Sequence, residues 1–485
     1  MRVSAGTIPE RLLRAAAELR DAGRIAEAIA AYRQALALNP QAPNSWYNLA
    51  RLQRQAGQPE AALQSYAEAL RRGIGDAEEV HLNRGVIFAD DLGSSDSAEA
   101  ELKRALELRP DYLPAWLNLG NLHEDRGDRR RARSAYEQAV AIAPSEPMAL
   151  ARLAGVADLS GPGDPLVGRL RSAIGEARAD PAARADLGFS LGAALDRVGA
   201  YDEAFAAYAA ANESSRAILG ARYDRSAQEA LVDRLIAAFP SPEARRPDGP
   251  GRAPIFICGM FRSGSTLAEQ ILARHESVTP GGELGLVPAL AEALRPYPEA
   301  AGSAAPEAVA RARAAYLNAL AKVHPGAGLV TDKRPDNFLH VGLIKRLFPE
   351  ARIVHTIRDP LDNILSLYFL HLDPGMAYAQ DLGDAAHWYG QYRRLMAHWR
   401  SLYPGDIHDL DYDALVADPR PRIEALLEFC GLPWLEACLS FHEAGNAVRT
   451  ASAGQVREPL YRRSSGRWRN YERHLGGLVE ALRGL

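Results

Sequence analysis

A regular spacing of small residues constrains the fold of the first half of the chain. Four glycines recur at steps of 34, 36 and 34 residues, and an alanine follows each of them by twelve residues. These residues are Gly23, Gly57, Gly93 and Gly127, with Ala35, Ala69, Ala105 and Ala139. Small side chains let paired helices approach closely, and each pair then buries its apolar face against the next pair. The period therefore predicts a stack of helical hairpins, an α-solenoid.

Other residues keep the same register, and together they resemble the tetratricopeptide repeat. Tyrosines stand three residues before three of the alanines, and prolines close repeats one, three and four. Residues 160–164, Ser-Gly-Pro-Gly-Asp, interrupt the pattern, and Gly199, Tyr208 and Ala211 restore it. We therefore predict that the tetratricopeptide-repeat solenoid spans residues 8–238, with one irregular repeat and a final helix.

The solenoid suggests an interaction surface without naming its ligand. Arrays of this kind present a concave face that can bind a peptide or a protein, and they can also act as packing or homodimerisation modules. Residues 239–252 are rich in Pro and Gly and indicate a linker. We expect a second domain over residues 253–485.

The second domain begins with the pattern of a strand, a glycine-bounded loop and a helix. Residues 254–259, Pro-Ile-Phe-Ile-Cys-Gly, are typical of a short buried strand. The next residues have the spacing of a P-loop, except that Ser265 occupies the lysine position. Such a loop presents backbone N–H groups and a helix N-terminus to an anion. Without the lysine, ordinary triphosphate chemistry is disfavoured, and Arg262 supplies a cation suited to an oxyanion.

This stretch resembles the phosphosulfate-binding loop of tyrosylprotein sulfotransferases and their bacterial relatives. Those enzymes use 3′-phosphoadenosine-5′-phosphosulfate as the sulfuryl donor. The resemblance implies that the loop binds the 5′-phosphosulfate and that Glu283, 21 residues after Arg262, is the general base. It also gives Arg262 a catalytic role. The loop residues are Arg262, Ser263, Gly264, Ser265 and Thr266.

Further motifs in the same order extend the resemblance to about residue 470. Lys333, which precedes an Arg-Pro turn, would offset charge on the transferring group. Arg358, in an Arg-Asp-Pro stretch that ends a second predicted strand, would hold the ribose 3′-phosphate together with Ser366. Tyr412 matches a tyrosine that contacts the donor, although a core tyrosine packed on the following helix fits the sequence nearly as well.

The C-terminal loop supplies the last match, and two departures from the family accompany it. Ser452 matches a serine near the sulfonate, and Arg467, before Trp468, stands where the family has a lysine that contacts phosphate. Leu370 replaces a second arginine for the 3′-phosphate. Arginines that face acidic residues around a target tyrosine are replaced by Gly285 and Ala289. The second departure suggests that acidic tyrosine peptides are poor acceptors.

Composition excludes several classes of protein. The formal net charge is −4, which gives no global basic excess for nucleic acid, and the apolar fraction of 47% allows sizeable cores. The three cysteines have no metal-ligand spacing and imply no disulfide framework. No apolar signal region or membrane-spanning run is found. We expect a cytoplasmic protein without a membrane span, a metal or a nucleic-acid partner.

The sequence thus predicts an α-solenoid followed by an α/β P-loop-like sulfotransferase domain with a central parallel sheet. The predicted reaction moves a sulfuryl group from 3′-phosphoadenosine-5′-phosphosulfate, a co-substrate, to a hydroxyl acceptor. That acceptor is a protein tyrosine or, alternatively, a saccharide or small molecule. Two other classes stay open: a nucleotide-dependent kinase on the same fold, and a non-catalytic repeat scaffold.

Overall fold

The computed structural model describes residues 8–218, 222–242, 253–372, 374–444, 456–457, 460 and 463–484. The chain divides into two compact units. The first comprises residues 1–159 and 168–173, and the second comprises residues 160–167 and 174–485. The α-solenoid and the α/β domain with a parallel sheet, both predicted from the sequence, are confirmed.

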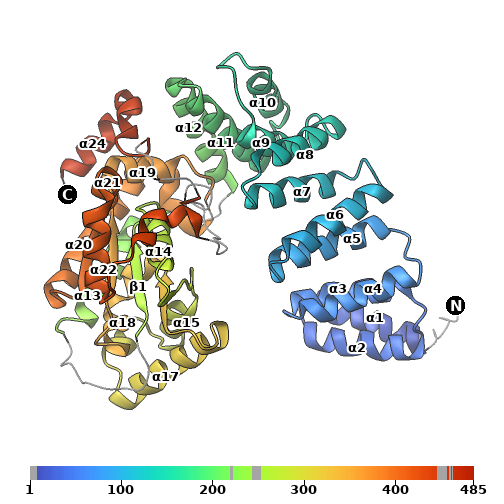
Figure 1. Ribbon diagram of the computed structural model, residues 1–485, viewed down its shortest axis with the longest axis horizontal. Helices are drawn as coiled ribbons and strands as arrows, with labels where there is room; N and C mark the ends of the chain where they lie inside the picture. The colour runs from blue at the N-terminus through green and yellow to red at the C-terminus, as the bar shows by residue number, and fades with distance from the viewer. Residues whose placement is uncertain are drawn as a thin grey trace. The chain divides into compact units, whose positions relative to one another are not determined.

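The first unit is built from helical hairpins that follow one another along the chain (Figure 1). The four hairpins from α1 to α8 each turn at one of the four periodic glycines, all of which have positive φ angles that suit glycine. The helices are α1 (Ile8–Asp21), α2 (Ile25–Leu38), α3 (Pro43–Gln55), α4 (Pro59–Arg71), α5 (Ala77–Val86), α6 (Ser95–Leu108), α7 (Leu113–Asp125), α8 (Arg129–Ile142) and α9 (Pro147–Val156). Helix α10 (Pro165–Glu176) is divided between the units, and residues 168–173 of it belong to the first.

The third hairpin departs from the repeat in two ways. Helix α5 continues into a π-helical turn, η1 (Ile87–Asp91), which overlaps the insertion that lengthens this repeat by two residues. His81 lies four residues before Gly85, at the position where the second and fourth hairpins have a tryptophan. Arg84 lies one residue before Gly85, where those hairpins have a leucine. Apolar packing positions in those hairpins are therefore polar in this one.

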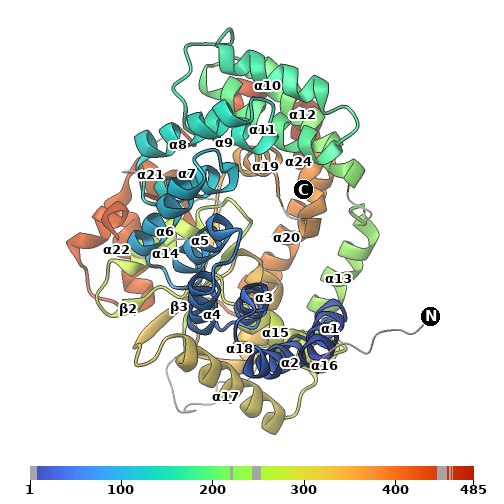
Figure 2. The ribbon, with the colours of Figure 1, turned by 90° about the vertical axis from the view of Figure 1, so that its right-hand side faces the viewer.

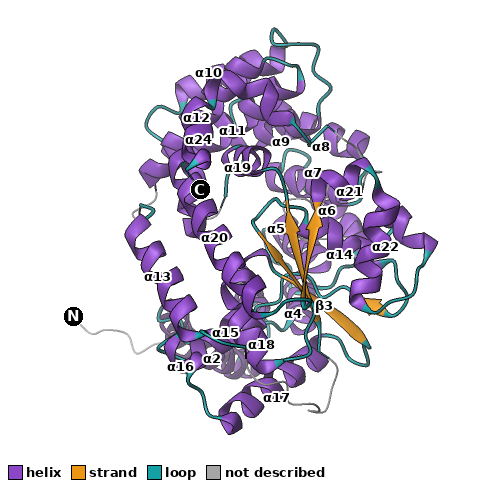
Figure 3. Ribbon diagram, turned by 90° about the vertical axis from the view of Figure 1, so that its left-hand side faces the viewer, coloured by secondary structure: helices purple, strands orange, loops and turns teal. Residues whose placement is uncertain are grey.

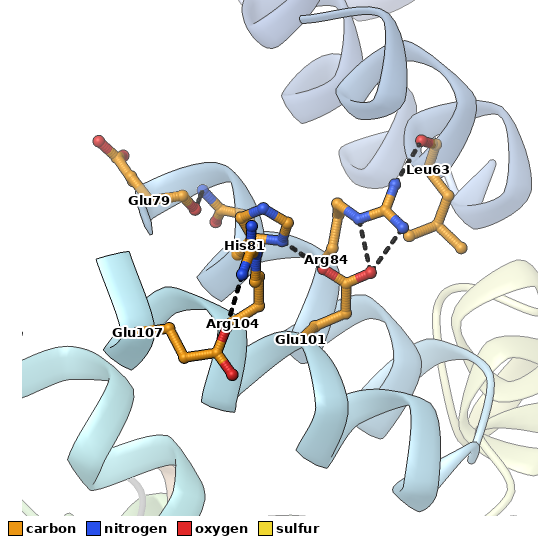
Figure 4. Close-up of polar contacts among 8 residues, drawn as sticks. Leu63, Glu79, His81, Arg84, Glu101, Arg104 and Glu107 are labelled. Atoms are coloured by element: carbon orange, nitrogen blue, oxygen red, sulfur yellow. Dashed lines mark hydrogen bonds and ion pairs between the residues drawn. The ribbon is translucent and has the colours of Figure 1, made fainter. Parts of the chain in front are cut away.

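These polar side chains pair with one acidic residue on the neighbouring helix. Glu101 of α6 accepts from His81 Nδ1 at 2.7 Å and from Arg84 Nη2 at 2.6 Å, and Arg84 also donates to the Leu63 carbonyl (Figure 4). All three side chains are less than a fifth exposed. Glu101 therefore accepts hydrogen bonds from two partly buried side chains at positions that are apolar in the second and fourth hairpins.

The second unit contains a five-stranded sheet in the order β2-β3-β1-β4-β5, and all paired strands are parallel. The strands are β1 (Ile255–Gly259), β2 (Val278–Thr279), β3 (Leu329–Lys333), β4 (Ile353–Ile357) and β5 (Ile407–Asp411). After β1 the chain first adds strands on one side and then on the other. The carboxyl ends of β3, β1 and β4 consequently meet at the switch point where ligands bind in such sheets.

Helices cover both faces of this sheet (Figure 3). On one face, apolar residues of the strands pack against α14 (Ser265–Ala273) and α22 (Pro419–Cys430). On the other, Phe256 of β1 packs on Tyr316 and Phe348, and His355 of β4 packs on Tyr392. The helices of this second face are α17 (Pro306–Val323), α18 (Val341–Leu347) and α20 (Leu382–Leu402).

The remaining elements connect these layers or lie at their margins. They are α15 (Leu286–Ala293), α16 (Glu299–Gly302), η2 (Pro335–His340), α19 (Pro360–Tyr368), η3 (Pro374–Gln380), α21 (Tyr412–Ala417), η4 (Glu436–Glu443), η5 (Arg467–His474) and α24 (Gly476–Arg483).

Three further helices belong to the second unit: α11 (Pro181–Arg197), α12 (Tyr201–Ile218) and α13 (Arg225–Ala238). The α11–α12 hairpin has repeat-like packing, because a Cβ at Gly192 would lie 2.7 Å from the Tyr208 ring, as one at Gly120 would clash with Tyr136. Helix α13 lies beside α20 (Figure 2). Phe239, at the start of the predicted linker, is buried against Trp399, and residues 243–252 lie outside the described residues.

Removal of the Glu101 carboxylate should loosen the third hairpin. We expect Glu101→Ala to destabilise α5 and α6 by about 1–3 kcal/mol, because it leaves Arg84 and His81 partly buried without their acceptor. Hydrogen exchange of the α5 and α6 amides in the full chain measures this change. The matched control is Glu107→Ala, which removes an exposed pair with Arg104 and should cost less than about 0.5 kcal/mol. Equal exchange in the two variants would contradict the expectation.

Candidate functional site

The loop between β1 and α14 forms the centre of the candidate site. Arg262 has φ 69°, the only positive φ at a non-glycine residue in the part of the chain that the structure describes. Backbone strain of this kind persists only where the surroundings impose it. Ser263 fixes the loop, because its Oγ donates to the Met260 carbonyl at 2.6 Å and lies 2.6 Å from Thr356 Oγ1 of β4. The loop is therefore held to two neighbouring strands.

The N-terminus of α14 follows directly. Gly264 is its N-cap with φ 105°, and a Cβ there would lie 2.9 Å from Tyr412 Cδ2. Ser263, Ser265 and Thr266 are all buried. The first turn of a helix has N–H groups without partners inside the helix, and its dipole favours an anion. The predicted oxyanion loop is thus built on a helix N-terminus.

The predicted 3′-phosphate residues lie beside this loop. Arg262 Nε donates to Ser366 Oγ at 3.2 Å, and Arg358 Nη1 donates to the Arg262 carbonyl at 3.2 Å. The Arg358 guanidinium lies 5.0 Å from the centre of the Tyr412 ring. The Nε of Arg358 is buried and has no hydrogen-bond partner among the residues that the structure describes, which is costly unless a ligand supplies one. Arg262, Arg358, Ser366 and Tyr412 are therefore brought together.

The position of Tyr412 is compatible with both interpretations of the sequence, a core tyrosine and a tyrosine that contacts the donor. Its ring packs against the apolar cluster between the sheet and α22, as expected for a core tyrosine. The same ring contacts Arg358 and approaches Gly264. It is partly exposed, so its position is compatible with contact to a bound nucleotide.

The predicted base and its cation are in direct contact. Lys333, the last residue of β3, is fully buried, and its Nζ donates to Glu283 Oε1 at 2.6 Å. The Glu283 side chain is 35% exposed, so one end of it reaches solvent. The Lys333 backbone N–H donates to the Gly282 carbonyl at 3.0 Å. Main-chain and side-chain bonds therefore fix the loop that carries Glu283 to the end of β3.

Sequence reasoning missed Glu269, which fixes the same loop from the other side. This buried residue of α14 accepts from the Gly282 N–H at 2.9 Å and from Thr331 Oγ1 at 2.7 Å. Burial raises the pKa of its carboxyl, and the nearby Lys333 acts in the opposite direction. In the sequence, the indication of this role is an acidic residue on the apolar face of a predicted helix.

Asp332 was likewise missed as a buried acid next to Lys333. Tyr316 Oη donates to it at 2.6 Å, and Asn337 Nδ2 donates at 3.1 Å. Burial raises the pKa of Asp332 to about 7, which these two hydrogen bonds only partly offset. The aspartate therefore titrates near neutral pH behind the predicted catalytic lysine.

The two predicted residues of the C-terminal loop have different outcomes. Ser452 lies outside the described residues. Arg467 is described, and its Nη2 pairs with Asp196 Oδ2 of α11 at 2.7 Å while its guanidinium lies 5.3 Å from the Phe369 ring. The structure thus gives Arg467 a protein partner that the sequence did not indicate.

Two kinds of feature are absent from the described part of the chain. No helix in these ranges is long and apolar enough to cross a membrane. No group of three or more His, Cys, Asp or Glu side chains in the same residues could hold a metal ion.

The fold and the site define an α/β domain with a glycine-bounded loop and a helix N-terminus at the switch point of a parallel sheet. Its sequence matches the model of the sulfotransferase family over residues 254–436. The tetratricopeptide-repeat model matches four overlapping segments, 13–77, 47–112, 89–147 and 117–161. The chain therefore carries a sulfotransferase family domain preceded by tetratricopeptide repeats.

Two curated relatives extend this finding. A protein of Aquifex aeolicus, named as uncharacterized, is 33% identical over 398 residues, which cover 79% of this chain and 52% of the relative. The chain thus spans about half the length of that protein. Protein-tyrosine sulfotransferase 1 of Danio rerio is 22% identical over 240 residues, which cover 44% of this chain and 65% of the relative.

Solved structures of both kinds are similar to parts of the chain. The sulfotransferase domain of the Synechococcus olefin synthase is 22% identical, with a TM-score of 0.36, over 47% of this chain and 91% of that one. A tetratricopeptide-repeat protein of Thermus thermophilus is 25% identical, with a TM-score of 0.29, over 38% of this chain and 98% of that one.

The raised pKa of Asp332 predicts a pH-dependent stability. Because its folded pKa of about 7 lies above the usual 3.8, folding takes up a proton between about pH 4 and pH 7. The stability that this group contributes is present at low pH and is lost as pH rises through 7. We expect the Tm of the wild type to fall relative to that of Asp332→Asn between pH 5.5 and 8. Parallel Tm curves for the two proteins would show that Asp332 does not titrate in this range.

Proposed function

We propose that this chain transfers a sulfuryl group from 3′-phosphoadenosine-5′-phosphosulfate to a hydroxyl acceptor. The observation that carries the proposal is the buried Nε of Arg358, which has no hydrogen-bond partner in the described part of the chain. Another nitrogen of Arg358 donates to the carbonyl of Arg262, whose own side chain contacts Ser366. A 3′-phosphate on the ribose distinguishes this donor from ATP and ADP, and an arginine is suited to bind it. In this proposal, the 5′-phosphosulfate and the 3′-phosphate of the donor bind at two neighbouring cationic sites.

In the proposed reaction, the acceptor oxygen forms a bond to sulfur while the bond from sulfur to the phosphate oxygen breaks. The products are a sulfate ester and adenosine 3′,5′-bisphosphate, and Glu283 takes the proton of the acceptor hydroxyl. Loop residues 263–266 and Arg262 bind the phosphosulfate. No redox step and no further co-reactant are required.

Lys333 has two roles in this proposal. Its bond to Glu283 holds the carboxylate at the end of β3, and its ammonium offsets the negative charge that gathers on the transferring group. A buried ammonium acts more strongly than an exposed one, because the local dielectric is low. The proposed base, Glu283, and the cation that would stabilise the transferring group, Lys333, are therefore in direct contact.

A protein tyrosine is the proposed acceptor, supported by the Danio rerio relative, whose name states that activity. Gly285 and Ala289 provide no cations beside the base, which favours a target without a dense acidic context. A saccharide or a small molecule is the alternative acceptor. The repeats are proposed to bind a protein or peptide partner, and 3′-phosphoadenosine-5′-phosphosulfate is proposed as the only co-substrate.

Nucleotide selectivity tests the donor assignment. We expect the wild type to bind adenosine 3′,5′-bisphosphate more tightly than AMP or ATP, as measured by calorimetry. Arg358→Ala should weaken bisphosphate binding by about 10–150-fold, the loss of a charge-assisted bond of about 1.5–3 kcal/mol, with AMP binding little changed. Arg393→Ala is the control, because Arg393 of α20 lines a cavity together with Arg358 and is a second cation close to the proposed site. Equal affinity for ATP and the bisphosphate would contradict the proposal.

The role of Glu283 is tested separately. Glu283→Gln keeps the shape of the side chain and its contact to Lys333 but cannot accept the proton. We expect turnover to fall about 10²–10⁴-fold with the affinity for the bisphosphate little changed. The control is Glu276→Gln at an exposed position after α14. Near-normal turnover of Glu283→Gln, under conditions where chemistry limits the rate, would exclude Glu283 as the base.

A further inference from the structure

The turn at residues 463–468, here called the C-terminal turn, contacts residues of the proposed donor site that follow β4 and β5. Arg358 Nη2 donates to the Ser464 carbonyl. Ser465 Oγ donates to Asp413 Oδ1 at 2.5 Å, and Asp413 Oδ2 accepts from the Asp359 N–H at 2.9 Å. The turn therefore holds the arginine that we assign to the 3′-phosphate, together with the residue that follows it.

Helix α19 fixes the other end of this turn. Asp362 accepts from the Gly466 N–H at 2.5 Å and from the Trp468 N–H at 2.7 Å. Asp362 is buried, and burial raises the pKa of its carboxyl while these bonds oppose the shift. The geometry of the turn thus depends on backbone donors that face a buried acid.

The same segment is anchored to α11 through one residue, Asp196. Its Oδ2 pairs with Arg467 Nη2 at 2.7 Å, and its Oδ1 accepts from Tyr471 Oη. The Asp196 side chain is 17% exposed, that of Arg467 is 29% exposed, and Tyr471 is fully buried. Both partners of Asp196 lie on η5, which begins where the C-terminal turn ends.

Aromatic packing makes this junction rigid. The Tyr208 ring of α12 stacks on Phe369 at 4.0 Å, and Asn212 Nδ2 donates to the Tyr368 carbonyl at 2.8 Å. Phe369 also packs against Tyr471 and under the Arg467 guanidinium. The α11–α12 hairpin is therefore a fixed support for η5 and for the end of α19.

We propose that Asp196 is a positioning residue for donor binding. By holding Arg467 and Tyr471, it keeps the C-terminal turn against Arg358, so that donor affinity depends on a helix hairpin which lies before the sulfotransferase family domain in the sequence. This inference rests on the proposed function. It assigns Arg467 the role of an anchor and not the direct phosphate contact expected from the sequence.

The charge balance of the junction supports the anchor role. If Arg467 left Asp196 for a donor phosphate, a carboxylate that is mostly buried would lose the cation that pairs with it and keep the hydrogen bond from Tyr471. Removing one partner of a buried ion pair leaves an uncompensated charge at high cost. The pair of Arg467 with Asp196 is therefore favoured over a contact of Arg467 with a donor phosphate.

The substitution Asp196→Asn distinguishes the two roles by the sign of its effect. In the anchor role, it loosens the turn and weakens the binding of adenosine 3′,5′-bisphosphate on the order of tenfold, with AMP binding unchanged. If Arg467 contacted the phosphate and Asp196 competed for it, the substitution would free the arginine and tighten binding. Tighter or unchanged bisphosphate binding in calorimetry would overturn the proposal.

Asp202→Asn is the matched control. Asp202, on α12, pairs with Arg473 and His474 of the same η5 segment but is 53% exposed and lies away from the turn. Bisphosphate affinity should be that of the wild type in this variant. A second test variant, Tyr471→Phe, keeps the ring and removes one bond to Asp196, so it should weaken bisphosphate binding in the same direction even where Asp196→Asn folds poorly.

Hydrogen exchange separates this inference from the proposed function. In Asp196→Asn the amides of Gly466 and Trp468 should exchange faster than in the wild type and in Asp202→Asn, whether or not a nucleotide binds. A wild type that binds no bisphosphate would overturn the proposed function and, with it, the link to donor affinity, whereas faster exchange would still locate the anchor. Unchanged exchange at these two amides would show that Asp196 does not hold the turn.

Discussion

The buried ammonium of Lys333 is the constraint on which the candidate site depends. A fully buried cation is stable only when acidic groups and hydrogen-bond acceptors lie close to it, and here Glu283 supplies the direct contact. That contact requires the loop before α15 to return to the end of β3. Glu269 on α14 and the backbone N–H of Lys333 both bind Gly282 and hold the loop there. The position of the proposed base thus follows from the need to pair one buried charge.

The parallel sheet brings the other half of the site to the same place. Because β1 lies between β3 and β4, the loop after β1 has Lys333 on one side and Arg358 on the other. One side offers the proposed base and its cation, and the other offers Arg358, whose Nε has no partner among the described residues. A donor with anionic groups at both the 5′ and 3′ positions of one nucleoside would reach both. The order of the strands, more than any single residue, creates this two-sided arrangement.

Local patterns allowed the strands near residues 254–259 and 351–357 to be predicted, together with the loops that follow them, because both are short apolar runs that end in a polar motif. Contacts between distant segments left no such signal. Asp196 and Arg467 are 271 residues apart, and neither lies in a periodic pattern that relates them. His81 and Arg84, the partners of Glu101, stand at positions that are apolar in the second and fourth hairpins, and the period of small residues gives no sign of this change. Glu269 was hidden because a buried acid on an apolar helix face resembles an ordinary helical residue until its partners are known.

The packing of α11–α13 changes how the repeats and the catalytic domain can be separated. A cut near residue 252 follows the family boundary, but it would remove Tyr208 from Phe369, Asp196 from Arg467 and helix α13 from α20. Large aromatic and charged surfaces of the second unit would then face water, with a loss of stability unrelated to acceptor binding. A protein that begins near residue 174 keeps these contacts and lacks the hairpins of the first unit. With that boundary, the contacts of α11–α13 with the rest of the second unit stay intact. A change in acceptor use then reports on the repeats of the first unit.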